Sequence, residues 1–581
     1  MFVILACQPD RMLLPADVDN LLCRSAEFAA LDPLAREAIR RRLVWLSLPG
    51  GSTLFTSGEI SDGLYVVRSG CLASLTDQGG TDYLIPAGGI VGGVGQITGD
   101  PRRRTVRAVR DTELLWLPSR HFTEVAGHHG AIMLATAQGA IRQLRDTSTD
   151  RRTGQPRTFA VLAHDRGVPA RTLATRLVQA LSRHGRAALI GPEHGAGRSG
   201  AWFAEREAEL DYTVYLDTEG EGVWRARCIR QADSLLLPVL AAQQATPWQG
   251  MAPDHPDDRR PHHLILIHPG HDVLQGAAAR WLMWLPPGAR QHHVRSGADV
   301  DRIARLVSGH GRGLVLAGGG ARGMAHLGAL RAFSEAGLAF DAVGGTSIGA
   351  IVAAGVAMGW PVERMADTMC AGFVSGRPLS DWTLPLVALT RGRRATRMLR
   401  RTFGAVSIED LPIPFFCVST NLSGAGKAVH RSGPLWQWLR ASSAIPGVLP
   451  PVTHDGGVFV DGALVDNLPT DVMRADDIGH ITAVDIRAGT SLTASLDETA
   501  SPHPLRVWFQ GRRGIVRPSL VSTLVRAAMV NAEVASAERR ALADLLLTPP
   551  LEHVGMLDWN GWQAAVDAGY AHTARVLKRG A

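Results

Sequence analysis

Residues 313–349 read GLVLAGGGARGMAHLGALRAFSEAGLAFDAVGGTSIG. The apolar run 314–317 predicts a buried strand, and the glycine-rich segment 318–323 predicts a loop at its end. Apolar residues then recur at helical spacing, and a second short strand follows at 342–344. This strand leads into a sharp turn at 345–349, from which another helix begins. The order strand, loop, helix, strand, turn, helix indicates an α/β domain.

The turn at 345–349 has the spacing of a nucleophile elbow. Gly345, Ser347 and Gly349 form a Gly-x-Ser-x-Gly motif. A strand turns this sharply into a helix only where the residues two positions either side of the serine are nearly free of side chain. The start of the following helix also favours negative charge that develops near the serine. Ser347 is therefore the candidate nucleophile.

The glycine loop supplies backbone N–H groups beside this serine, and such groups can bind the oxyanion of a tetrahedral intermediate. The candidate oxyanion residues are Gly318, Gly319, Gly320, Arg322 and Gly323. Their spacing also matches the fingerprint of dinucleotide-binding domains. That alternative requires an acidic residue at the end of the second strand. Asp341 instead precedes that strand, and the elbow follows it.

A carboxylate suited to act as the base ends another predicted strand, 457–461. Asp461 is followed by Gly462 and Ala463. The three motifs, in this order, resemble those of the patatin-like phospholipase family. The resemblance implies a three-layer α/β domain and a Ser347–Asp461 dyad without histidine, in which the aspartate accepts the serine proton and later activates water. The nearby alternative, Asp466, lies off the strand end.

The order of domains is similar to that of the neuropathy target esterase branch, in which a cyclic-nucleotide-binding-like region precedes the catalytic domain. Residues 440–446 also resemble the block that the family carries between the elbow and the aspartate. The similarity extends from about Leu43 to the C-terminus. The resemblance implies that the chain hydrolyses acyl esters of phospholipids or lysophospholipids and needs no cofactor.

Composition limits the class of protein. A chain of 581 residues predicts three or four domains. A hydrophobic content of 45% and a charged content of 20% are typical of a globular protein. The net charge of +7 is mild for this length, so we expect no nucleic-acid partner, but it suits an anionic membrane surface.

The sequence has neither a basic leader segment nor a run of 18 or more apolar residues. We therefore expect a cytoplasmic protein, peripheral on the inner face of the membrane. Six dispersed cysteines form no CxxC pair and suggest neither a disulfide framework nor a zinc site. The histidine pairs 262–263 and 292–293 lack the helical spacing of metal ligands, so we expect them in solvated loops and expect no metal site.

Residues 1–42 predict a helical lead-in, and residues 43–144 predict a β-barrel or jelly roll of short strands. The second region resembles a cyclic-nucleotide-binding domain, with Arg102 at the place of the phosphate-pairing arginine. Gly93 stands where that family carries a glutamate for the ribose hydroxyl. The alternatives are a working nucleotide sensor, a barrel that binds no nucleotide, and a basic surface that contacts lipid headgroups.

Residues 158–297 alternate strands with helices, which predicts a doubly wound α/β domain. Its loop 163–172 stands where a P-loop would, but contains no Gly-Lys-Ser/Thr. We expect a non-catalytic spacer or docking module, joined by residues 298–310 to the catalytic domain at 312–488. Residues 489–581 predict an alanine-rich helical extension.

A run of arginines follows the elbow; its members are Arg391, Arg393, Arg394, Arg397, Arg400 and Arg401. The run indicates either a surface that orients the protein on phospholipid or a solvated helix face. Trp382 and the apolar segment 384–387 just before it are a candidate lid. We expect the helix that carries Leu327 and the turn 446–449 to line the acyl slot.

Three functions stay open on the sequence. The leading one is a serine esterase that removes acyl chains from phospholipids or lysophospholipids. The second is an acyltransferase that uses the same dyad, in which an alcohol replaces water. The third is a regulatory, nucleotide-responsive protein with an inactive hydrolase fold.

Overall fold

The structure is a computed structural model. It describes residues 15–486 and 537–580, except for 26, 27, 30, 76–80, 147–156, 199, 221, 249–259 and 425. Residues 1–14, most of the stretch between the predicted β-barrel and the predicted α/β domain that follows it, and the start of the predicted C-terminal extension lie outside the described residues. The chain divides into two compact units, which are described separately: one holds residues 1–267, 281–290 and 296–308, and the other holds 268–280, 291–295 and 309–581.

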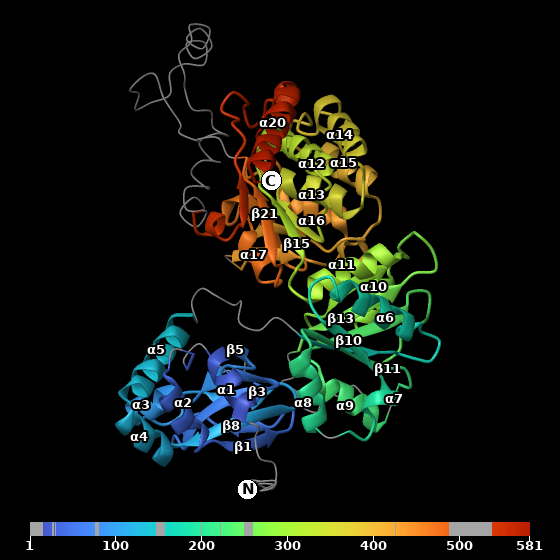
Figure 1. The fold of residues 1–581 in the computed structure, drawn as a ribbon. Helices are drawn as coiled ribbons and strands as arrows, with labels where there is room; N and C mark the ends of the chain where they lie inside the picture. Colours follow the sequence, from blue (N-terminus) through green and yellow to red (C-terminus); the bar gives the residue numbers. More distant parts are fainter. Residues whose placement is uncertain are drawn as a thin grey trace, which may run out of the picture. The chain divides into compact units, whose positions relative to one another are not determined.

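The first unit begins with two helices and two four-stranded antiparallel sheets, whose orders are β1-β8-β3-β6 and β2-β7-β4-β5 (Figure 1). The elements are α1 (Pro15–Arg24), α2 (Pro33–Arg40), β1 (Val44–Leu48), β2 (Thr53–Phe55), β3 (Gly63–Ser69), β4 (Cys71–Leu75), β5 (Thr81–Pro86), β6 (Ile90–Val91), α3 (Gly93–Thr98), β7 (Thr105–Ala108), β8 (Thr112–Pro118), α4 (Ser119–His128) and α5 (Gly130–Asp146). Alternating side chains of these strands are buried in two apolar clusters. The predicted jelly roll is confirmed.

The next part of the chain forms a six-stranded sheet in the order β10-β11-β9-β12-β13-β14, in which β10 to β13 pair in parallel. The elements are β9 (Thr158–Leu162), α6 (Ala170–Leu181), β10 (Ala187–Ile190), α7 (Pro192–Gly195), α8 (Gly200–Glu209), β11 (Tyr212–Asp217), α9 (Val223–Gln231), β12 (Ser234–Leu240), β13 (His262–Ile267), α10 (Ala277–Leu282), β14 (Arg290–Val294) and α11 (Gly297–Val307). The strand order reverses at β9, as in a doubly wound sheet. The predicted α/β domain is confirmed.

One local prediction in this region was wrong. The histidine pairs 262–263 and 292–293 lie in strands β13 and β14 and are buried, because each strand places both of its faces in the interior. Residues 298–307, most of the predicted connection to the catalytic domain, belong to helix α11. Ser296 and Asp299 cap the start of that helix with a reciprocal pair of hydrogen bonds, and its apolar face packs on α6.

The second unit is built on the sheet β19-β20-β17-β16-β15-β21-β22, with β18 paired to β17. The strands are β15 (Arg312–Leu316), β16 (Ala342–Thr346), β17 (Phe415–Asn421), β18 (Gly426–His430), β19 (Val452–His454), β20 (Gly457–Asp461), β21 (His480–Val484) and β22 (Leu545–Leu547). The central strands from β17 through β22 are parallel, whereas β18, β19 and β20 run antiparallel to their neighbours.

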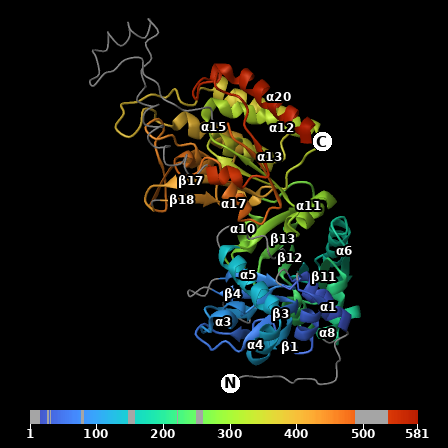
Figure 2. The same ribbon diagram turned by 60° about the vertical axis from the view of Figure 1, so that its left-hand side comes forward.

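Helices cover this sheet, as Figure 2 shows from a second direction. They are α12 (Ala325–Glu335), α13 (Ile348–Ala357), α14 (Val362–Met369), α15 (Arg393–Phe403), α16 (Leu435–Ser442), α17 (Thr470–Arg474) and α20 (Trp562–Gly580). Helix α13 packs on β15, β16 and β17, and α20 packs on α12. The C-terminal stretch predicted to be helical also contributes β22, the last strand of the sheet. Among the described residues, no helix combines the length and the apolar character that crossing a bilayer requires.

Candidate active site

Ser347 lies in the turn between β16 and α13, with φ 55° and ψ −126°. This left-handed backbone is costly for any residue with a side chain, and close packing maintains it. A Cβ at Gly345 would lie 2.4 Å from the carbonyl oxygen of Leu316, and one at Gly349 would lie 2.2 Å from the same oxygen. The two glycines therefore let the elbow pack directly on strand β15.

Ser347 Oγ donates a hydrogen bond of 2.8 Å to Asp461 Oδ2, although 114 positions separate the two residues. Asp461 ends β20, which pairs with β17 and so brings the carboxylate to the elbow. Its other oxygen accepts the Ala463 N–H at 2.9 Å. A Cβ at Gly462 would lie 2.2 Å from the Val418 carbonyl oxygen, so only glycine fits after the aspartate. The bond between Ser347 and Asp461 joins two motifs that the sequence singled out.

The Asp461 carboxyl is 4% exposed. Burial raises its pKa to about 6, although the hydrogen bonds from Ala463 N–H and Ser347 Oγ act in the opposite direction. At neutral pH the group is ionised but holds a proton far more readily than an exposed aspartate does. This property suits a general base that works near pH 7.

The loop after β15 lies against the nucleophile. A Cβ at Gly318 would be 3.0 Å from Ser347 Cβ, so the loop backbone and the serine are in direct proximity. The Gly318 N–H points to Asn467 O at 3.4 Å, and the Ala321 N–H donates to Met556 O at 2.7 Å. The N–H groups of Gly319 and Gly320 have no acceptor among the described residues. These two amides are the donors that the loop leaves open to an oxyanion.

Two other residues of the predicted oxyanion set serve the packing of the loop. The Arg322 side chain donates from Nε to Val554 O at 2.7 Å and is half-buried. A Cβ at Gly323 would lie 2.4 Å from the Ile348 side chain. The structure thus ties Arg322 to the C-terminal part of the unit and uses Gly323 for the approach of the loop to α13.

Sequence reasoning missed two residues that hold this arrangement. Ser442, at the end of α16, accepts the Ser347 N–H at 2.9 Å and donates to Val418 O at 2.6 Å. Asn467 donates from Nδ2 to Gly318 O at 3.1 Å. Ser442 lies within the 440–446 block that drew attention in the sequence, but no pattern there indicates its partner.

Other titratable groups near the sheet do not bond to the serine. Asp466 is paired with Lys427 at 3.0 Å and with Arg539 at 3.2 Å. His326 is fully buried and bonds through Nε2 to Ala317 O at 2.8 Å, and burial lowers its pKa to about 4. No histidine hydrogen-bonds to Ser347, and no cluster of three metal-ligating side chains occurs, among the described residues.

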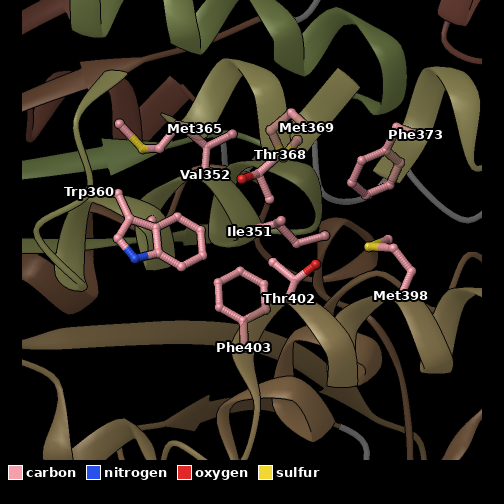
Figure 3. Close-up of a pocket in the computed structure, with 11 residues that line it drawn as sticks. Ile351, Val352, Trp360, Met365, Thr368, Met369, Phe373, Met398, Thr402 and Phe403 are labelled. Carbon is pink, nitrogen blue, oxygen red and sulfur yellow. The ribbon is translucent and has the colours of Figure 1, made fainter. Parts of the chain in front are cut away.

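An apolar pocket begins one helical turn beyond the serine (Figure 3). Ile351 and Val352 of α13 form one wall, and Met398 and Thr402 of α15 face them. The other lining side chains are Trp360, Met365, Thr368, Met369, Phe373 and Phe403. The free volume is about 10 Å³, roughly what one water molecule needs. Methionine side chains are flexible enough to move aside for a larger apolar group.

In the barrel, Arg102 is already paired. It is 4% exposed, forms an ion pair with Asp62 and donates to Gly63 O at 2.8 Å. Its guanidinium also lies 4.1 Å from the centre of the Phe55 ring. A carboxylate of the protein therefore already pairs with Nη2 of Arg102, the residue predicted to bind the nucleotide phosphate.

Comparison with known proteins places each part of the chain. Residues 314–474 match the family described as patatin-like phospholipase, residues 45–129 match the cyclic nucleotide-binding domain, and residues 155–308 match the P-loop like domain of the neuropathy target esterase (NTE) family.

Full-length relatives agree with these matches. An uncharacterised NTE family protein of Mycobacterium bovis is 31% identical over 93% of this chain and 92% of the relative. The neuropathy target esterase of Drosophila melanogaster is 28% identical over 93% of this chain and 43% of the relative. A protein named lysophospholipase from Pyricularia oryzae is 28% identical over 92% of this chain and 42% of the relative.

Replacement of the buried carboxylate should stabilise the protein. The pKa of Asp461 rises from 3.8 to about 6 on folding, so its ionisation opposes folding once the pH exceeds that range. Asp461→Asn removes this cost, about 3 kcal/mol at pH 8. The variant should therefore melt at a higher temperature than the wild type at pH 8, and the gain should disappear near pH 4, where both side chains are neutral. Calorimetry at pH 8 and at pH 4 measures the difference in melting temperature between the variant and the wild type.

The exposed Asp272 supplies a control, since Asp272→Asn should leave the melting temperature unchanged at both pH values. A lower melting temperature for Asp461→Asn than for the wild type at pH 8 would show that the carboxylate stabilises the fold.

Loss of the Ser442 hydroxyl should displace the elbow. Ser442→Ala leaves the buried N–H of Ser347 without its acceptor, which costs about 1–3 kcal/mol. We expect the kcat for ester hydrolysis to fall about 10- to 100-fold with little change in KM. Ser443→Ala is the matched control, because Ser443 Oγ donates only to carbonyls of its own helix. Equal losses in both variants would contradict the positioning role of Ser442.

Proposed function

The chain belongs to the neuropathy target esterase family and carries a patatin-like phospholipase domain, and from that premise we propose that it is a serine esterase that hydrolyses the acyl esters of phospholipids or lysophospholipids. The single observation that carries the proposal is the 2.8 Å hydrogen bond from Ser347 Oγ to Asp461, next to unpaired amides of the glycine loop.

The reaction would proceed in two steps on these groups. Ser347 Oγ attacks the ester carbonyl carbon while its proton passes to Asp461 Oδ2. The carbonyl oxygen becomes an oxyanion that the N–H groups of Gly319 and Gly320 bind, at about 3–4 kcal/mol per donor. The protonated Asp461 then donates to the leaving alcohol as the C–O bond breaks. A water molecule, deprotonated by the same carboxylate, attacks the acyl-enzyme and releases the fatty acid.

The substrate class follows from two further supports. Relatives at 28% identity bear the names lysophospholipase and neuropathy target esterase. The Met-lined pocket, which begins one helical turn beyond Ser347 at Ile351, offers apolar walls for an acyl chain once the side chains of Met398 and its neighbours move. The sequence had favoured the Leu327 helix for this role. Neither Leu327 nor the turn 446–449 lines this pocket, whose walls come from α13 to α15 and the segments between them.

The barrel and the location of the protein belong to the same proposal. The match of the barrel to the cyclic nucleotide-binding domain makes a cyclic nucleotide a candidate ligand, with Arg102, which also pairs with Asp62, as its candidate contact. We propose a cytoplasmic enzyme that meets its lipid substrate peripherally, on the inner face of the membrane. No cofactor takes part in the proposed reaction.

Ser347→Ala should abolish hydrolysis, because no other group can form the acyl-enzyme. We expect at least a roughly 10⁴-fold loss of fatty-acid release from lysophosphatidylcholine, with an unchanged melting temperature. A fluorophosphonate probe should label the wild type on the peptide that contains Ser347 and leave the variant unlabelled.

Product analysis with added glycerol separates the two transfer chemistries. Free fatty acid as the main product supports hydrolysis, whereas monoacylglycerol as the main product would identify an acyltransferase. Full activity of Ser347→Ala would exclude both.

Narrowing the Met-lined pocket should select against long acyl chains. Thr402→Phe adds a ring to the α15 wall, so we expect kcat/KM for a long-chain p-nitrophenyl ester to fall about 10- to 100-fold. The value for the acetyl ester should change less than twofold. Ser334→Phe, at an exposed position of α12, is the control and should affect neither ester. An unchanged chain-length profile in Thr402→Phe would place the acyl chain elsewhere.

A further inference from the structure

A short hairpin projects apolar side chains before helix α15. Trp382 and Thr390 pair as an antiparallel bridge at its base. The side chains at and beyond the base are mostly exposed: Trp382 65%, Leu384 73%, Leu386 85% and Val387 73%. Isolated exposed apolar residues are ordinary, but four within six positions mark an interaction surface.

The hairpin is anchored to the body of the unit. The Leu389 N–H donates to Gly447 O at 2.8 Å, and the Thr390 N–H donates to Val448 O at 3.1 Å. The Arg391 N–H donates to Asp381 O at 2.9 Å, which closes the base where the arginine run begins. The apolar tip is therefore held next to α15.

Helix α15 separates two different environments. Its buried residues Ala395, Leu399 and Phe403 face the interior of the unit. The opposite side borders a groove of about 680 Å³. The arginines that line the groove are Arg391, Arg393, Arg397, Arg400, Arg401 and Arg440. No acidic side chain is among the described residues that line it, so the lining is positively charged, and Asp381 is a carboxylate that acts on Arg440 from outside the lining.

Arg440 extends this charge into the wall of the groove. It is 4% exposed and donates from Nη2 to Pro450 O at 3.0 Å. Its Nε and Nη1 have no hydrogen-bond partner among the described residues. Burial lowers its pKa to about 10, so it stays charged at neutral pH. A buried, incompletely paired guanidinium favours an anionic ligand.

We propose that the hairpin tip and the arginine groove together form the surface by which this protein docks on an anionic lipid bilayer. The apolar tip enters the acyl region, and the arginines bind the phosphate groups of the headgroups. The proposal deepens the proposed esterase function by naming where the enzyme meets the lipid, and it rests on that function for its purpose.

The apolar hairpin tip and the arginine groove together favour a bilayer over a soluble phosphate compound. A phosphate in water could satisfy the groove but would leave Leu384, Leu386 and Val387 exposed. A bilayer offers both an anionic surface and an apolar interior within reach of one side of a protein. Helix α16 also carries both Arg440, in the groove, and Ser442, bonded to the Ser347 amide. Docking at the groove would therefore bring the lipid near the candidate active site.

Vesicle sedimentation tests the proposal in the full chain with Ser347→Ala, so that no lipid is consumed. We expect binding to phosphatidylcholine vesicles that contain phosphatidylglycerol to exceed binding to phosphatidylcholine alone. Adding Arg397→Gln and Arg400→Gln should lower the partition coefficient on anionic vesicles about 30-fold, from two lost charges. Leu386→Ser with Val387→Ser should weaken binding to both vesicle types.

The matched control is Arg575→Gln with Lys578→Gln, which removes two exposed charges from α20 and should leave binding within about twofold. Equal losses in the control and the groove variant would overturn the proposal, as would binding that ignores phosphatidylglycerol. Stabilisation by inorganic phosphate without vesicle binding would also overturn it and identify a soluble ligand. Because every binding protein here lacks Ser347, these outcomes are independent of whether the wild type hydrolyses an ester.

Discussion

The carbonyl oxygen of Leu316 is the point on which the candidate site depends. A side chain at either Gly345 or Gly349 would collide with it, so the elbow closes onto β15 only because both are glycine. The resulting contact holds Ser347 in a left-handed conformation that an isolated turn would leave. It also sets the glycine loop, which continues from β15, beside the serine. One steric constraint thus aligns the hydroxyl, the amides and the strand that supports them.

The sequence predicted the parts of this arrangement that have a local cause. The elbow, the glycine loop and Asp461 lie at the ends of strands. Such strands can be recognised in the sequence as apolar runs that are followed by glycine. The fold class of all three regions was confirmed in this way. Ser442 and Asn467 escaped notice because each acts through one hydrogen bond to the backbone across a large sequence separation. A single hydrogen bond of that kind produces no repeating pattern in the sequence.

The differences between prediction and structure have equally physical reasons. Residues 298–310 were predicted only as a connection between domains, and Val300 and Ile303 give the helix in it an apolar face that packs in the interior. The histidine pairs were assigned to loops because they lack the helical spacing of metal ligands, yet they lie buried in β13 and in the edge strand β14. β22 covers three residues, Leu545–Leu547, too few for a strand to be distinguished from a helix by pattern.

The glycine loop also depends on contacts with a distant part of the sequence. Its Ala321 N–H and the Arg322 side chain are both bound by carbonyls near residue 555, more than two hundred positions later. A nascent chain therefore holds the nucleophile, the aspartate and the loop long before it holds the clamp that shapes them. Synthesis from the N-terminus delays assembly of the site until the residues near 555 have left the ribosome. Copies truncated before them would hold Ser347 and Asp461 but lack the carbonyls that fix the glycine loop.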